Sequence, residues 1–509
     1  MSVRRLRGAP AAIATALLAA SLTLSACGGT TSASGPAVTE IVLGQVTEPA
    51  NSPDPVMDGS LAGYSYYYNL YDSLTVLDND GKITPRLATE WKSSDDLKTW
   101  TFTVRTGVTF HNGDPLTAAD VAYTYQTILA NPESGPRSYM QPLKSVEATD
   151  DTTVVFHLKT PFSPFPSVTT SVSIVPKEVY AELGSEEFAK APVGSGPYRF
   201  ESWTKGVSYV MVRNDDYWGP RPPLDKITFQ TVADEDARLN GVLSGSLDLA
   251  LIAPNQVDSL AGNPDVRAES MESNGVTFLG LNATAGPLQD EKVRRALALA
   301  IDKEALASGV LSGRAAARAQ LIAPRVAGFD PSVERNVHDL EQAKALIAES
   351  GYSGEPIPFE YAVDGRIPLS EEIAQAIQGM AAEAGITLDL KGMDQATLSS
   401  RIYSTEDMAG VYLNTYAPSQ MDGDPVIEDM FAGGSNDYAE LDETNALVLK
   451  TRETSAQERI DTYGELMELN LERALLIPLY TPETNYVVDA GLAWQPRADG
   501  LFFFGGTAQ

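Results

Sequence analysis

The residue types that could perform chemistry are few in this chain, and their spacing does not fit a known reaction. The three histidines, His111, His157 and His338, are far apart and do not form a metal-ligand spacing. The stretch VGSGPY at 193–198 holds a serine between glycines. A nucleophile elbow needs G-x-S-x-G, however, and a phosphate loop needs G-x-x-x-x-G-K-[ST]. We therefore predict that this stretch is a tight turn before the strand YRFESW.

Two further groups could be considered for catalysis. His111 lies in TFHNGDPL, a turn between a strand and a helix, and no serine or cysteine can be assigned as its partner. Paired acids such as Asp422 and Asp424, or the acidic run at 234–236, are common in a chain with 68 acidic residues. Without evidence of burial, such acids are interpreted as solvated faces. The sequence therefore predicts no enzyme, no cofactor and no metal site.

The single cysteine, Cys27, lies where it can carry a lipid. Three arginines and an apolar run precede it, and a Gly/Ser/Thr tract follows it. The apolar run is shorter than the roughly 20 residues that span a bilayer. The tetrad LSAC, which ends at Cys27, resembles the bacterial lipobox. We predict a lipoprotein signal peptide at 1–26, a lipidated Cys27, a tether at 27–37 and anchoring to the outer face of the cell membrane. An ordinary signal peptide with an incidental cysteine is the alternative.

The size and charge of the chain limit its partners. Removal of the signal peptide leaves 509 − 26 = 483 residues, which is enough for two or three domains with substantial cores. The net charge is −31, and the loss of three arginines makes it −31 − 3 = −34. Such a surface repels phosphate backbones, so nucleic acid is excluded as a predicted partner. The absence of further cysteines fits an exported protein that is stabilised by its core.

Strand and helix patterns alternate along the whole chain. A helix is predicted over 117–131, where Thr117 caps it and Asp120 occupies the third helical position. Other helices are predicted to begin at Asp290 and Asp339. The segment 357–392 contains a strand, a helix and a strand, which is the order of a βαβ unit. We predict a mixed α/β fold whose chain crosses back and forth between lobes.

The stretch YSYYYNLYDSL contains five tyrosines within eight residues. Tyr64, Tyr68 and Tyr71 have the i, i+4, i+7 spacing of a helix face, and we predict that they belong to the core. Tyr66 and Tyr67 are left open between core packing and a ligand cleft, since tyrosine combines a large contact area with a hydroxyl group.

Several ordered stretches resemble one known family. They are GKITPRLATEW, TFTVRTGVTFHNGDPLTAADVAYTY, APVGSGPYRFESW, VRNDDYWGPRPPLDKITF, LSGSLDLA, FLGLNATAGPLQDEKVRRALALAIDKEAL, DLEQAKALIAESGY and IPLYTPE. Together they cover essentially all of residues 38–509 and are similar to the family 5 bacterial extracellular solute-binding proteins. That family is the dipeptide, oligopeptide and nickel-binding group of ABC importers.

The resemblance implies a periplasmic-binding-protein-like flytrap of three domains. Domain I is discontinuous, over 38–74, 189–287 and 478–509, domain II is inserted at 75–188, and domain III spans 288–477. The resemblance further implies a ligand between domains I and III, delivery to a membrane permease, and ATP hydrolysis by separate subunits.

The resemblance also nominates residues for ligand binding. Asp58, Gly59 and Ser60 follow SPDP and are expected to line the cleft, together with Tyr416 and Asp422 of domain III. A surface loop is the alternative for each of them.

Peptide binders of the family hold the α-ammonium on an aspartate four residues before a proline. Here that position is Met421, which would suit an adaptable apolar wall, and Asp422 is one residue late. Either a shift of one residue restores Asp422 to this role, or the protein does not recognise a free amine. A peptide is our first prediction for the solute. An oligosaccharide or another non-peptide solute, or a ligand-sensing receptor without transport, are the alternatives.

Overall fold

The structure, a computed structural model, describes residues 39–48, 53–333, 337–364, 367–454 and 456–505. Residues Val38–Gln509 form one compact unit. The predicted signal peptide at 1–26, the lipidated Cys27 and the tether at 27–37 lie outside the described residues. These three stay predictions.

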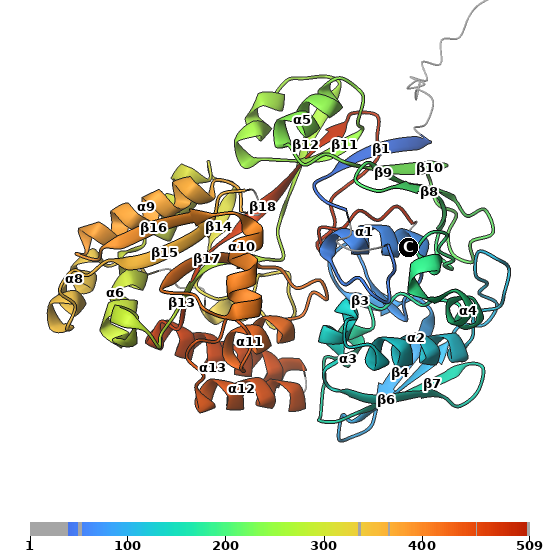
Figure 1. Cartoon of the computed structure of the whole chain (residues 1–509), viewed down its shortest axis with the longest axis horizontal. Coiled ribbons are helices and arrows are strands. Elements are labelled where there is room, and N and C mark those ends of the chain that lie inside the picture. Colours follow the sequence, from blue (N-terminus) through green and yellow to red (C-terminus); the bar gives the residue numbers. More distant parts are fainter. Residues whose placement is uncertain (1–38, 49–52, 334–336, 365–366, 455, 506–509) are drawn as a thin grey trace, which may run out of the picture. The chain divides into compact units, whose positions relative to one another are not determined.

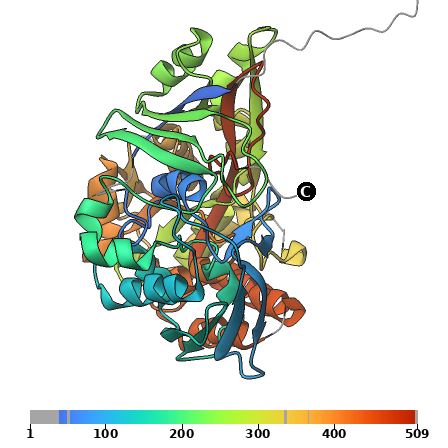
Figure 2. The same cartoon turned by 90° about the vertical axis from the view of Figure 1, so that its right-hand side faces the viewer.

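A large mixed sheet runs through the compact unit in the order β16-β15-β17-β13-β18-β11-β1-β10-β9-β8, and β12 and β14 also pair with β18. One long strand, β18 (Leu476–Asp489), joins its two parts (Figure 1, Figure 2). The first half of β18 pairs with β13 and β14, and the second half pairs with β11 and β12. We call residues 39–272 and 490–505 the first lobe and residues 276–475 the second lobe.

The first lobe contributes six strands to this sheet. They are β1 (Glu40–Gln45), β8 (Tyr198–Thr204), β9 (Ser208–Arg213), β10 (Lys226–Thr231), β11 (Leu249–Ile252) and β12 (Val266–Glu272). β1 lies between β10 and β11 and is parallel to both, so it has no free edge. Helix α5 (Glu235–Leu243) connects β10 to β11.

A smaller antiparallel sheet lies within the first lobe and has the order β4-β5-β7-β6. Its strands are β4 (Ala88–Ser93), β5 (Thr99–Val104), β6 (Leu143–Ala148) and β7 (Thr153–Leu158), and the hairpin of β2 (Thr75–Leu77) and β3 (Ile83–Pro85) precedes them. In β5, Trp100, Phe102 and Val104 are buried while the threonines between them are partly exposed, as the alternating pattern predicts.

Helices cover this small sheet and connect it to the rest of the first lobe (Figure 1). They are α2 (Ala118–Ala130), α3 (Phe165–Val168), α4 (Lys177–Phe188) and the 3-10 helix η1 (Gly135–Met140). The predicted start of α2 is confirmed, because Thr117 and Asp120 form a reciprocal capping box.

The second lobe contains the rest of the large sheet. Its strands are β13 (Val276–Leu281), β14 (Ala315–Ala317), β15 (Ile357–Ala362), β16 (Leu388–Met393) and β17 (Val411–Tyr416). The predicted βαβ unit is confirmed, because β15 and β16 are parallel and α9 (Ser370–Glu383) connects them.

The other helices of the second lobe follow the sequence patterns closely. They are α6 (Glu291–Ala300), α7 (Lys303–Ala305), α8 (Leu340–Glu349), α10 (Gln395–Ser400), α11 (Asp424–Phe431), α12 (Asp442–Glu453) and α13 (Ala456–Arg473). Asp290 and Asp339 cap α6 and α8 as predicted, since each carboxylate accepts a backbone N–H of the first turn.

The proposed domain boundaries stay a prediction. Strand β13 falls inside the predicted segment 189–287 of domain I. It nevertheless pairs along its whole length with β17 of the second lobe.

The tyrosine-rich stretch forms α1 (Leu61–Leu70) in the core of the first lobe. Tyr64, Tyr68 and Tyr71 are buried, which confirms the prediction that they belong to the core, and Tyr71 lies just after the end of the helix. Tyr66 and Tyr67 are buried as well. The ring of Tyr66 stacks on Tyr209 with 4.6 Å between centroids, so core packing applies to this residue too.

Candidate functional site

A cavity of about 420 Å³ lies between the two lobes. The first lobe contributes the η1 region and the segment around Phe162, and the second lobe contributes Tyr416, Gln420 and α11. This volume falls within the range of roughly 300–1,000 Å³ that small-molecule sites occupy. The residues that line the cavity belong to the predicted domains II and III. The family resemblance, by contrast, implied a ligand between domains I and III.

The lobes touch each other at one side of this cavity. The backbone N–H of Ser163 donates to the carbonyl of Arg452 at 2.9 Å, and the Arg452 guanidinium lies 5.5 Å from the centroid of the Phe162 ring. A cation over an aromatic face contributes about 0.5–2 kcal/mol, depending on exposure. These contacts hold the second lobe against the first in the arrangement that encloses the cavity.

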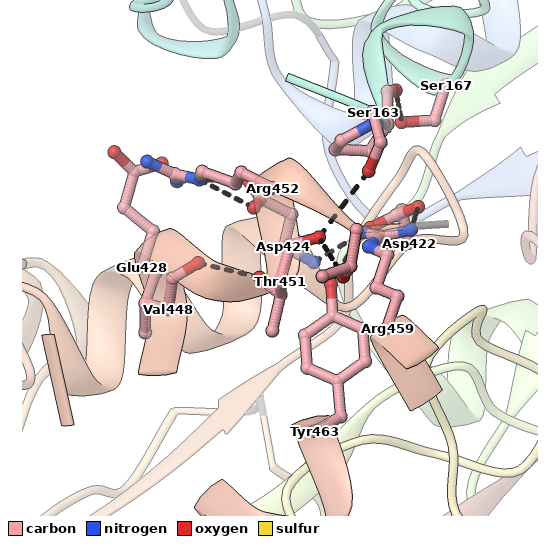
Figure 3. A network of polar contacts seen from close by, with 12 residues as sticks. Ser163, Ser167, Asp422, Asp424, Glu428, Val448, Thr451, Arg452, Arg459 and Tyr463 are labelled. Atoms are coloured by element: carbon pink, nitrogen blue, oxygen red, sulfur yellow. Dashed lines mark hydrogen bonds and ion pairs between the residues drawn. The ribbon is translucent and has the colours of Figure 1, made fainter. Parts of the chain in front are cut away.

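Two arginines from α12 and α13 neutralise carboxylates at the start of α11 (Figure 3). Arg452 binds both oxygens of Asp424, at 2.7 and 2.9 Å, and also contacts Glu428 at 3.0 Å. Arg459 binds both oxygens of Asp422 and donates to the hydroxyl of Tyr463. Bidentate pairs of this kind fix orientation as well as charge. They tie the loop before α11 to the two helices behind it.

Asp429, on α11, also lines the cavity but has different partners. The side-chain amide of Asn436 donates to its Oδ2 at 2.5 Å, and no ion pair to it occurs among the described residues. Burial raises the pKa of Asp429 to about 6, and the hydrogen bonds from Asn436 and from the backbone of Ser435 only partly oppose that rise. Asp429 therefore has neutral hydrogen-bond donors and no cationic partner among the described residues.

Gln420 has a buried side-chain donor near the same cavity. It lines the same cavity, only 2% of its surface is exposed, and its side-chain amide nitrogen is buried without a hydrogen-bond partner in the part of the chain that the structure describes. A buried donor left unpaired destabilises a protein by about 1–3 kcal/mol, so an orphan of this kind calls for an explanation.

The three predicted residues near α1 have structural partners. Asp58 is buried, and its Oδ2 accepts from Ser60 Oγ at 2.9 Å and from the Tyr67 hydroxyl at 3.0 Å. Burial raises the pKa of Asp58. Ser60 is the N-cap of α1, and the carbonyl of Gly59 accepts from the Tyr139 hydroxyl at 3.2 Å. None of the three lines the cavity between the lobes, and their ligand role stays a prediction.

Of the three ligand-binding residues predicted in the second lobe, one lines the cavity. Tyr416 lines the cavity. Met421 is buried in a small apolar cluster with Leu77 and Ala498 of the first lobe, so it packs between the lobes, and it is not among the residues that line this cavity. Asp422 is buried with both oxygens on Arg459.

The structure adds Asp429, Gln420, Arg452 and Arg459, which sequence reasoning missed. No local signal marks them, since the two arginines lie 28 and 37 residues from the carboxylates that they bind.

A second cavity between the lobes, of about 1000 Å³, lies between α5 and the start of α9. Two of its charged side chains have structural partners. Asp234 caps α5, and the Arg238 guanidinium donates to the carbonyls of Leu251, Val232 and Ala233.

The residues first considered for catalysis have structural roles. Ser195 is fully buried and donates to Asp72 at 2.9 Å. A Cβ at Gly194 would lie 1.9 Å from the carbonyl oxygen of Leu70, so this glycine permits a close backbone approach. His111 contacts the carbonyl of Gly196 at 3.0 Å, and burial lowers its pKa to about 4. In the described part of the chain, no group of three acidic, histidine or cysteine side chains could hold a metal ion.

Comparison with known proteins identifies the class. The family model of the bacterial extracellular solute-binding proteins, family 5, matches residues 82–438. Protein XP55 of Streptomyces lividans is 31% identical over 418 residues, which cover 78% of this chain and 75% of that protein. This chain therefore belongs to the family 5 solute-binding proteins.

Two further relatives cover nearly the whole chain. One from Escherichia coli (strain K12), named "Probable D,D-dipeptide-binding periplasmic protein DdpA", is 26% identical over 91% of this chain and 93% of its own length. The solved structure of AgaA from A. tumefaciens R10, in complex with agropinic acid, has a TM-score of 0.77 at 26% identity and covers 91% of this chain and 96% of its own.

These findings confirm the predicted α/β flytrap fold and the prediction that the chain is not an enzyme. It is an extracellular solute-binding protein of the kind that serves an ABC importer. Among the described residues, no helix is both long and apolar enough to cross a membrane.

Proposed function

We propose that this protein captures a peptide-like solute in the cavity between its lobes and delivers it to an ABC permease, whose ATPase subunits lie in the cytoplasm. The observation that carries the proposal is the cavity of about 420 Å³, which is lined from both lobes and bordered by the contact between Ser163 and Arg452. A site built from two lobes couples binding to closure, because only the closed arrangement completes it. The name of DdpA, which refers to a D,D-dipeptide, supports a peptide-like solute.

We also propose that Cys27 carries a lipid that holds the protein at the outer face of the cell membrane. A diacylglycerol together with an amide-linked acyl chain is enough for stable anchoring. Replacing Cys27 by serine should release the protein into the medium, whereas the wild-type chain should stay with the membrane fraction. Equal release of both would contradict the anchor.

A non-peptide solute is the second candidate, and one observation favours it. Met421 occupies the position at which peptide binders of the family carry an aspartate, and the neighbouring Asp422 is already neutralised by Arg459. AgaA, a relative solved with agropinic acid, shows that the family is not restricted to peptides.

The first experiment uses the chain from Gly28 onward, which keeps the whole compact unit Val38–Gln509. Native mass spectrometry of the purified protein detects any solute that stays bound through purification. Thermal unfolding with peptides and with oligosaccharides then tests both classes. A solute at 100 times its dissociation constant adds about 2.7 kcal/mol to the free energy of unfolding. Binding of peptides supports the proposal, and binding of oligosaccharides alone overturns the peptide assignment.

A further inference from the structure

One contact between the lobes joins the end of a helix to a turn of the opposite lobe. The last carbonyls of α12 have no N–H partner further along the helix, as at any helix end. The first lobe supplies partners for two of them. The backbone N–H of Ser163 donates to the Arg452 carbonyl at 2.9 Å, and the Ser163 hydroxyl donates to the Thr451 carbonyl at 3.4 Å (Figure 3). The end of α12 is therefore capped in part by the other lobe.

The side chain of Arg452 adds a second contact at the same place. Its guanidinium lies 5.5 Å from the centroid of the Phe162 ring, and only 13% of the Arg452 side chain is exposed. Burial strengthens the attraction between a cation and an aromatic face, because less water competes for the charge. The bidentate pair with Asp424 fixes the guanidinium in this position. We call Phe162, Ser163, Thr451 and Arg452 the latch.

Both sides of the latch also border the cavity. Phe162 lines the cavity from the first lobe, and the two carboxylates that bind Arg452, those of Asp424 and Glu428, line it from the second lobe. Every contact of the latch joins one protein group to another. The latch can therefore form whether or not a solute occupies the cavity.

We propose that the latch closes the lobes in a substantial share of the solute-free molecules and thereby controls access to the cavity. A closed molecule takes up a solute only after the latch opens, so the latch slows entry, and the same contacts slow release of a bound solute. The equilibrium between open and closed protein is then set by Phe162 and Arg452 as well as by the solute. This inference goes beyond the proposed function, because it applies to whichever solute the cavity binds.

Pulsed electron paramagnetic resonance tests the latch through the distance between two spin labels, one on each lobe. The chain from Gly28 onward contains no cysteine, so Lys144→Cys on β6 and Ala446→Cys on α12 provide two specific labelling sites. Both side chains are exposed, and both elements lie at the lower end of their lobes in Figure 1. Unfolding in guanidinium, dialysis and refolding remove any solute that stays bound through purification.

Two variants weaken the latch, and a third is the matched control. In the labelled parent chain we expect a shorter distance from closed molecules and a longer one from open molecules. Phe162→Leu should lower the ratio of closed to open molecules about three- to tenfold, since leucine is apolar but has no aromatic face. Phe162→Ala should lower it at least as much. Phe165→Leu is the control, because Phe165 is buried in the same core and its ring contacts Trp100, Phe102 and Phe156 of the small sheet.

The outcomes decide whether the latch acts as proposed. An unchanged ratio in the Phe162 variants overturns the proposal, and so does a labelled parent chain that has no closed molecules. An equal decrease in Phe165→Leu also overturns it, since the effect then comes from a loss of core packing. Circular dichroism verifies folding, and Phe162→Leu decides alone if the alanine variant does not fold. The measurement uses no solute, so failure of the latch leaves the proposed binding function intact, and failure of peptides to bind leaves the latch intact.

Discussion

The segments 53–60 and 416–431 both bury aspartates, but they satisfy them with different partners. In the first segment, Asp54 accepts from the Tyr180 hydroxyl at 2.7 Å, the Ser185 hydroxyl at 2.5 Å and the Val56 N–H at 2.9 Å. In the second segment, Asp422 and Asp424 are each bound by an arginine. The comparison shows two ways to bury a carboxylate, with neutral donors or with an opposite charge.

The two arrangements have different consequences. Burial raises the pKa of Asp54 and of Asp58, whose partners are neutral donors, and it also raises the pKa of Asp424, although Arg452 opposes that rise. An arginine compensates the charge and also ties together helices that are distant in the chain. Asp429 lies in the second segment but has the neutral donors of the first. It differs from Asp54 because it lines a cavity, so it has room for a cation that Asp54 lacks.

The largest effect is expected for an arginine of the second segment. Arg459→Met leaves the buried Asp422 without a cation, and it should lower the free energy of unfolding by about 3–5 kcal/mol. The double variant Arg459→Met/Asp422→Leu should recover most of that loss, since it removes both charges. Urea unfolding at pH 7 measures both. A loss below about 1 kcal/mol in the single variant would show that the pair does not stabilise the lobe.

The corresponding variant of the first segment is expected to have a smaller effect. Asp54→Ala leaves the Tyr180 and Ser185 hydroxyls without their acceptor, and it should lower the free energy of unfolding by about 2–3 kcal/mol. Asp54→Asn should be milder, because the amide oxygen still accepts one of these hydrogen bonds. If alanine and asparagine have equal effects in urea unfolding, the hydrogen bonds are not what Asp54 contributes.

Asp429→Asn should stabilise the solute-free protein by about 2 kcal/mol above pH 7. The pKa of Asp429 is raised from 3.8 to about 6, so the ionised carboxylate is disfavoured in the folded state. The groups around it are the carboxylates of Glu428 and Asp437, the hydroxyls of Tyr412 and Tyr416, and the side chain of Asn436. The folded state then binds more protons than the unfolded state between about pH 4 and 6, and its stability decreases as the pH rises through that window.

Urea unfolding between pH 4 and 8 checks this prediction. The difference between Asp429→Asn and the wild type should be small at pH 4 and should grow until about pH 6.5. A difference that does not depend on pH would rule out the titration of Asp429 as its cause.

The smallest change in the free energy of unfolding is expected at Ser60. Here a structural role as the N-cap of α1 can be distinguished from the predicted role in ligand binding. Ser60→Ala removes the acceptor for the Gly63 N–H at the start of α1, and it should lower the free energy of unfolding by about 1 kcal/mol. Ser60→Thr should retain most of this stability. Unchanged solute retention by Ser60→Ala would leave Ser60 a structural residue, whereas a clear loss of retention would place it in the binding site.

Much of the fold follows from local patterns in the sequence. The capping box of Thr117 and Asp120, the N-caps at Asp290 and Asp339, and the strand–helix–strand unit over 357–392 all occur where the patterns predict them. These features depend on neighbours within a few residues, and such neighbours are visible in the sequence. The burial of Tyr64, Tyr68 and Tyr71 was predicted from their helical spacing, but α1 is buried on all sides from Gly63 to Leu70, which that spacing does not predict.

Only the tertiary structure decides which polar groups remain free in the cavity. The sequence by itself determined the family, the α/β alternation and the general position of the second segment. It does not show that Arg459 neutralises Asp422, that Arg452 neutralises Asp424, or that Asp429 and Gln420 are left without such partners. Those pairings join residues from different segments of the second lobe, and they depend on how the chain packs in space. Burial and pairing together decide whether an aspartate stabilises the fold or binds a solute.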